Sequence, residues 1–136
     1  GVLHDLDYDI IRGDMSRHGL VAAKMLKGKL PRECLHAIQS HDYRTDVKPK
    51  SVMDKALIAA DCIWGLIVRT ALATSHRKVH QIRLNEMKNE FKNEAFPKFL
   101  AKGIMMCRQI NFTLEDFFKL ALKSLPEDWT IDEDDL

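Results

Sequence analysis

The residues of this chain with the clearest chemical potential are histidines and aspartates in its first half: His4, Asp5, His18, His41 and Asp61. Neutral imidazole and carboxylate are ligands for zinc, manganese, iron or nickel, and they do not select among these metals. In the His4–Asp5 doublet, a ring nitrogen and a carboxylate oxygen can reach the same ion, and the carboxylate can bridge to a second ion. If the fold brings the five residues together, they predict a metal site.

The spacing of neighbouring apolar residues predicts which histidines point inward. His18 and His41 each lie on an apolar helical stripe, with residues three, four and seven positions away sharing their face. The stripe of His18 contains Val21, Ala22 and Met25, and that of His41 contains Cys34, Ala37 and Ile38. His36 has polar neighbours and is expected at the solvent or at a rim, and His76 and His80 are expected at a charged helix end and not in a metal site.

Asp61 is the only charged residue in the segment ALIAADCIWGLIV, which runs from Ala56 to Val68. A helix over this segment surrounds Asp61 with Leu57, Ile58, Trp64 and Gly65. An unpaired buried carboxylate is costly, so Asp61 must be ion-paired, hydrogen-bonded, protonated or bound to a metal. Capping of a neighbouring helix or pairing with a basic side chain stays open as the structural alternative.

The pattern predicts an all-α fold, because no segment shows sustained alternation typical of strands. Ser16, Ser51 and Thr113 are expected N-caps, and Asp54 and Asp116 stand three residues after two of them. The expected helices cover residues 16–27, 31–41, 51–73, 84–94, 97–109 and 113–125, with loops at 5–15 and 42–50.

Length and composition favour one domain over residues 1–136, with a motif-bearing half at 1–73, a helical extension at 84–125 and an acidic tail at 127–136. Lys and Arg number 21 against 20 Asp and Glu, so the basic excess of a protein that binds nucleic-acid polymers is absent. Three dispersed cysteines without a CxxC pair favour a reducing compartment. With no signal peptide and no apolar run of about 18 residues, a cytoplasmic protein without a membrane partner is expected.

Four segments carry a family likeness in their order: LHDLDYD, RHGLVAAKML, LHAIQSHD and ALIAADCIWGLIV. Together they resemble the HD superfamily of metal-dependent phosphohydrolases, and more narrowly a group of small predicted HD hydrolases from bacteria and archaea. The likeness implies an HD-domain-like helical bundle with a central metal site. It also implies one or two divalent ions, with Mn, Fe, Zn, Ni and Co not distinguished.

In this resemblance, His4 and Asp5 match the signature doublet, Asp61 matches the distal aspartate, and His18 and His41 match positions that bind a second ion. The family also uses a histidine upstream of the doublet, so an N-terminal helix is expected to be missing before Gly1. Members that read HD-x-G-K differ from this chain, which has Asp7 and Tyr8 at the last two positions. A lysine contact to phosphate at that place is therefore not implied.

The expected activity is hydrolysis of a phosphate ester by attack of metal-activated water. Asp5 is the expected bridging carboxylate. Asp7, followed by Asp9 and Asp14 of the same loop, is a candidate general acid or base, and a solvated, turn-forming aspartate is the alternative for each of the three. Arg17, followed by Arg12 and Arg44, is the candidate for holding the substrate phosphate. The partner would be a small phosphorylated molecule, with nucleotides among the candidates, and the oligomeric state is open. The alternative is a non-catalytic HD-like helical module for ligand sensing or protein interaction.

Overall fold

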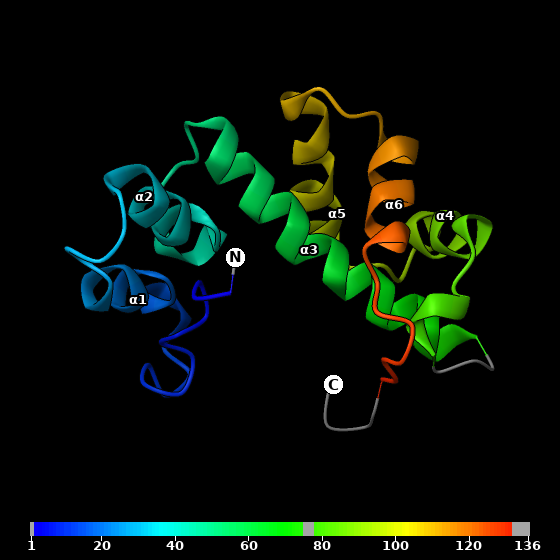
Figure 1. Cartoon of the computed structure of the whole chain (residues 1–136), viewed down its shortest axis with the longest axis horizontal. Helices are drawn as coiled ribbons and strands as arrows, with labels where there is room; N and C mark the ends of the chain where they lie inside the picture. Colours follow the sequence, from blue (N-terminus) through cyan, green and yellow to red (C-terminus); the bar gives the residue numbers. More distant parts are fainter. Residues whose placement is uncertain (1, 75–77, 132–136) are drawn as a thin grey trace. The chain divides into compact units, whose positions relative to one another are not determined.

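A computed structural model describes residues 2–74 and 78–131 of the chain. Within these ranges the protein consists of six α-helices with short 3-10 helices between them, and no strand is formed (Figure 1). The α-helices are α1 (Leu20–Met25), α2 (Arg32–Ser40), α3 (Val52–Ala73), α4 (Leu84–Lys92), α5 (Lys98–Ile104) and α6 (Leu114–Lys123). The 3-10 helices are η1 (Met15–Arg17), η2 (Tyr43–Thr45), η3 (Val79–Gln81) and η4 (Met105–Ile110). The prediction of an all-α fold is confirmed.

The chain divides into two compact units, Gly1–Ala59 and Ala60–Leu136. Helix α3 begins in the first unit and continues into the second. The sequence predicts that the motif-bearing half ends at residue 73. The compact first unit ends earlier, at Ala59, within α3.

The first unit is built around the packing of α1 against α2. Ala22, Ala23 and Leu26 of α1 and Ile38 of α2 are buried in one apolar cluster. Leu30, Leu35 and Leu57 are partly buried against it. Full burial of a leucine or isoleucine side chain, as for Leu26 and Ile38, stabilises a fold by roughly 1.5–3 kcal/mol. Of the predicted inward stripes, Ala22 and Ile38 belong to this cluster and Ala37 is buried, whereas Met25 is exposed.

The helix predicted over residues 16–27 is wrong in its first part. The chain forms η1 and then turns at Gly19, whose φ of 78° is a conformation that residues with a side chain rarely adopt. A Cβ at Gly19 would lie 2.3 Å from the carbonyl oxygen of Ile38 and 3.1 Å from the ring of His41. Gly19 therefore permits a backbone approach between α1 and α2 that no other residue allows. Ser16 donates to Asp14 instead of capping a helix.

The two N-caps predicted farther along the chain are confirmed. At the start of α3, the Ser51 hydroxyl accepts from the Asp54 amide at 3.1 Å, and the Asp54 carboxylate accepts from the Ser51 amide at 2.9 Å. At the start of α6, the Thr113 hydroxyl accepts from the Asp116 amide at 3.0 Å. Both caps satisfy amide groups that the first helical turn leaves without partners.

The second unit is held by aromatic packing. Phe91 of α4 contacts Phe96 and Phe118, with ring centroids 5.7 and 5.5 Å apart. Trp64 of α3 stacks on Trp129, with centroids 4.6 Å apart and the rings 17° from parallel. Such aromatic pairs contribute about 0.5–1.5 kcal/mol each beyond their buried area. The residues after α6 are thus fixed to α3 by an aromatic contact.

Within the described residues, α3 is the one helix whose length and apolar character would allow it to cross a membrane. The expectation that no such stretch exists is therefore not met. Half of its most apolar stretch is buried inside the structure, and the core helix of a soluble protein has the same properties. One helix of this kind does not by itself indicate a membrane-spanning segment.

Candidate metal centre

The first unit brings together four of the five predicted ligands: His4, Asp5, His18 and His41. The Asp5 Oδ1 atom lies 3.0 Å from His18 Nε2 and 3.5 Å from His41 Nε2, and the two Nε2 atoms are 3.2 Å apart. The other carboxylate oxygen of Asp5, Oδ2, lies 3.2 Å from His4 Nε2. His18 and His41 are buried, as their apolar stripes predict, whereas half of the Asp5 side chain is exposed.

The second ring nitrogen of each buried histidine identifies its tautomer. His41 Nδ1 lies 2.7 Å from the carbonyl oxygen of Ile38, which can only accept, so Nδ1 of His41 carries a hydrogen. His18 Nδ1 lies 2.9 Å from the carboxylate of Asp7 and donates to it. The remaining nitrogen of each ring, Nε2, is therefore turned toward its counterpart and toward Asp5. Two ring nitrogens and one anionic oxygen meet at this point, so a positive species belongs there, either a proton or a cation.

Asp7 is the buried support of this arrangement. Its side chain is fully buried, and its second oxygen accepts from the amides of Gly19 and Ala22, each at 2.8 Å. These amides belong to the start of α1, so Asp7 caps this helix from a distance while fixing the ring of His18. A carboxylate with both oxygens engaged and no exposure suits the positioning of a ligand better than the acid–base role predicted for Asp7.

The atoms around the convergence point have the spacing of ligands to one ion. Two nitrogens bound at about 2.0–2.1 Å to the same cation lie about 2.9–3.4 Å apart at common bond angles. The separation of 3.2 Å between His18 Nε2 and His41 Nε2 fits this range. Two imidazoles with one carboxylate form a ligand set that binds zinc or non-haem iron and keeps positions for water and substrate. The residues present therefore fit a divalent metal.

The charge of Asp5 suits the same role. The pKa of its carboxyl is lowered, first by hydrogen bonding with the ring of His41 and then by the proximity of His4 and His18, against the opposing effect of burial. Asp5 is therefore an anion at neutral pH. Its two oxygens face different histidines, which is the orientation that a carboxylate bridging two ions requires.

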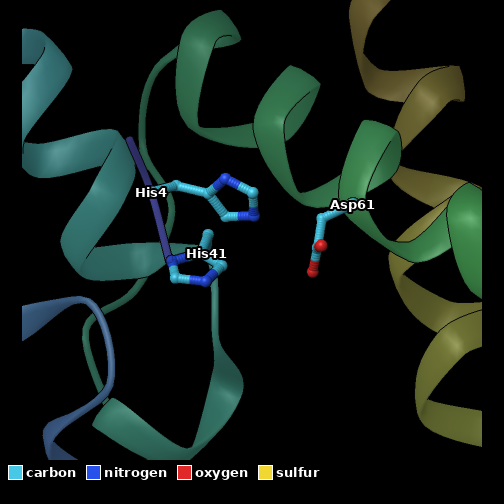
Figure 2. A group of neighbouring side chains, drawn as sticks. All are labelled: His4, His41 and Asp61. Atoms are coloured by element: carbon cyan, nitrogen blue, oxygen red, sulfur yellow. The ribbon is translucent and has the colours of Figure 1, made fainter. Parts of the chain in front are cut away.

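The ring of His4 completes the histidine cluster. His4 and His41 lie edge to face, with centroids 4.9 Å apart and planes at 83° (Figure 2). Candidate ligand atoms of these two residues lie within 4.8 Å of one another. Asp61, which Figure 2 also labels, is carried by α3 beyond the end of the first unit and is partly exposed. Its role as a ligand stays a prediction.

The three arginines predicted to hold a phosphate differ in their surroundings. Arg44 is engaged by Asp42: its Nε donates to both carboxylate oxygens, at 2.9 and 3.1 Å. Arg12 and Arg17 are exposed, and within residues 2–74 and 78–131 neither forms an ion pair. Arg17 stays the first candidate because it adjoins His18, and Arg44 becomes the weakest.

One further pair of ionisable residues in the first unit was not foreseen from the sequence. His36, expected at the solvent or a rim, is about two-thirds buried, and its Nδ1 lies 2.9 Å from the fully buried Asp54. The sequence offers little indication of this pair, because Asp54 is already explained as part of the helix cap that begins at Ser51. Of the two other histidines set aside in the sequence, His80 is exposed in η3, and His76 lies outside the described residues.

Comparisons of the chain with protein-family models, with curated proteins and with solved structures find no match.

Proposed function

We propose that this chain is a metal-dependent phosphohydrolase of the HD type, an HD-like helical bundle that hydrolyses a phosphate ester, with nucleotides among its candidate substrates. The carrying observation is the triangle formed by Asp5 Oδ1, His18 Nε2 and His41 Nε2, with sides of 3.0, 3.2 and 3.5 Å. Hydrogen bonds at Nδ1, on the opposite side of each ring, hold both Nε2 atoms toward this triangle.

The residues present divide the work of such a site. A divalent cation bound there would supply Lewis acidity, activating water and polarising a phosphoryl oxygen. His18 and His41 would hold it from the buried side, and the half-exposed Asp5 would face solvent, where a substrate can enter. Asp7 would keep His18 in its tautomer and orientation. Arg17 would pair with a phosphate oxygen through charge-assisted hydrogen bonds.

Asp61 belongs to the proposal as a further ligand. Its support is chemical: it is the one charged residue from Ala56 to Val68, on a helix otherwise made of apolar and small residues in that span. A carboxylate retained in such a segment needs a compensating interaction. Because Asp5 presents one oxygen to His4 and the other to His18, the cluster offers ligands for two ions.

The test combines metal analysis with an activity panel. We expect protein purified without chelators to contain one or two transition-metal ions per chain and to hydrolyse some of a panel of mononucleotides, cyclic nucleotides and small phosphate esters. Asp5→Asn should remove both properties, and Asp61→Ala should lower both. The control Asp46→Asn changes an exposed aspartate whose φ of 61° suits asparagine, and it should alter neither. Retention of metal and activity by both Asp5→Asn and Asp61→Ala would contradict the proposal.

A non-catalytic helical module is the rival function, and one observation favours it. The 3.2 Å separation of the two Nε2 atoms also suits a shared proton, which would make the cluster a buried polar network without metal. Protein that stays metal-free in excess Mn²⁺, Fe²⁺, Zn²⁺, Ni²⁺ and Co²⁺ would establish this rival. A cytoplasmic location is part of the proposal, since Cys34 and Cys107 are free thiols.

A further inference from the structure

A second region of the first unit has the features of a ligand site and takes no part in the proposed metal centre. An open groove of about 1060 Å³ lies along α1 and α2 and the connection between them. Its charged lining residues are Lys24, Lys27, Arg32 and Glu33, and its apolar lining includes Leu30. Three cations against one carboxylate make the groove distinctly positive in a chain whose net charge is +1.

The cations of the groove are not neutralised by ion pairs. Lys24, Lys27 and Arg32 are exposed, and in the part of the chain that the structure describes none of them lies within salt-bridge distance of an acidic group. The positive potential is therefore directed to the solvent, where it attracts anions.

His36 adds a positioned polar group to the same groove. Its Nδ1 donates to Asp54 Oδ2, and the same oxygen accepts from the amides of Lys50 and Ser51 at 2.7 and 2.9 Å. Burial alone would raise the pKa of the Asp54 carboxyl, but these hydrogen bonds outweigh burial and lower it. With Asp54 ionised, Nδ1 is occupied, and Nε2 of His36 is the nitrogen left for a ligand. A salt bridge that only joined α2 to α3 would not require the three cations beside it.

We propose that this groove binds a small organic anion, whose carboxylate or phosphate head is paired by Lys24, Lys27 and Arg32, and by His36 Nε2 in the form of the ring that carries a hydrogen on both nitrogens, and whose apolar body lies along Leu30 and its apolar neighbours. Carboxylate and phosphate share the chemistry that these donors recognise, namely anionic oxygens that accept charge-assisted hydrogen bonds. The mixture of an apolar wall with a few polar groups is typical of sites for small molecules. The groove needs neither a metal nor the ligands of the candidate metal centre.

The experiment titrates the full chain separately with hexanoate, hexyl phosphate and uncharged hexanol. NMR measures the chemical shifts of the backbone amides and of the ring nitrogens of His36. We expect saturable shifts in α1, in α2 and at His36 with at least one anion and none with hexanol. The preferred anion identifies the head group. The double variant Lys24→Gln/Lys27→Gln should weaken binding about 2- to 30-fold, since two exposed charge pairs are lost.

Two controls separate this site from other effects. Lys29→Gln removes an exposed lysine of the same segment that does not line the groove, and it should leave affinity unchanged. Asp5→Asn, which alters the candidate metal centre, should also leave it unchanged. His36→Gln keeps a donor for Asp54 and removes the ring, and it should weaken binding without unfolding the chain. Absence of saturable shifts, or equal loss of affinity in Lys29→Gln and in the double lysine variant, would overturn the proposal.

Discussion

The first unit contains two aspartate–histidine pairs with the same local geometry and different surroundings. Asp7 and His18 are 2.9 Å apart, as are Asp54 and His36, and both carboxylates are fully buried. In the first pair, the other nitrogen of the ring faces Asp5 and His41. In the second pair, the histidine lines an open groove among lysines. The chemistry of each Asp–His pair is therefore determined by the groups around its histidine: Asp5 and His41 at His18, and lysines at His36.

The difference shows why a buried carboxylate next to a histidine is not by itself a functional assignment. Asp7 directs a lone pair toward other metal-binding atoms, so the first pair prepares a cation site. Asp54 holds its histidine beside exposed lysines, so the second pair suits an anion, to which Nε2 donates when both ring nitrogens carry hydrogens. The predictions below test this contrast.

The largest contrast is expected between His18→Ala and His36→Ala. Loss of His18 removes one of the ligands of the triangle and should weaken metal binding by more than about 100-fold, beyond the loss usual for a supporting residue. Loss of His36 should leave metal affinity within about twofold of the parent protein, since it lies in the other pair. Competition with a chromophoric chelator measures both. Equal affinities of the two variants would remove the distinction between the pairs.

Gly19→Ala tests the close approach that places His18 beside His41. An added methyl would meet the Ile38 carbonyl oxygen at 2.3 Å in an unfavourable backbone conformation, and we expect about 3 kcal/mol of destabilisation. Gly28→Ala is the matched control, because Gly28 has a similar φ of 80° with no atom within 4 Å of the new methyl. It should cost only about 1 kcal/mol. Urea unfolding gives both values, and equal losses would mean that the approach is not required.

Asp7→Asn and Asp54→Asn compare the two carboxylates directly. The amide keeps the shape of the Asp7 side chain but weakens its hold on His18, so metal affinity should fall by about 10–100-fold. Asp54→Asn should leave metal affinity unchanged. Calorimetric titration with Zn²⁺ or Mn²⁺ provides the measurement. An unchanged affinity in Asp7→Asn would show that Asp7 serves only to cap α1.

The smallest effect is a dependence on pH. The Asp54 carboxyl has a lower pKa in the folded chain than its ordinary value of 3.8, so the unfolded chain binds more protons in acid. The ionised Asp54 carboxylate therefore stabilises the fold fully above pH 3.8, and this stabilisation disappears as the pH falls through the lower folded-state pKa. Asp54→Asn should therefore destabilise the chain by about 1–2 kcal/mol at pH 7. The difference should shrink below about pH 4, and a difference that grows in acid would contradict the ionised state of Asp54.

Helical periodicity predicted much of the fold because α2, α3 and α6 have apolar stripes within single segments, and α3 and α6 also have N-caps there. It also predicted that His18 and His41 are buried. For His18 the structural reason differs, since it precedes α1 and lies outside any α-helix. The stripe that His18 shares with Ala22 exists in the sequence, but Gly19 interrupts the helix that would display it.

The supporting contacts could not be predicted, because they join residues far apart in the chain. The amides that bind Asp7 come 12 and 15 positions later, and His36 meets Asp54 across 18 positions. No local pattern encodes such pairs, so Asp7 had the features of a solvated loop aspartate and His36 those of a surface residue.

The aromatic residues give each compact unit its own optical signal. Both tryptophans, Trp64 and Trp129, belong to the second unit, and both tyrosines, Tyr8 and Tyr43, belong to the first. Because Trp64 stacks on Trp129, unfolding of the second unit changes the emission of both rings at once. Tyrosine absorbance follows the first unit. One denaturation series recorded with both probes therefore reveals whether the halves of α3 melt together or separately.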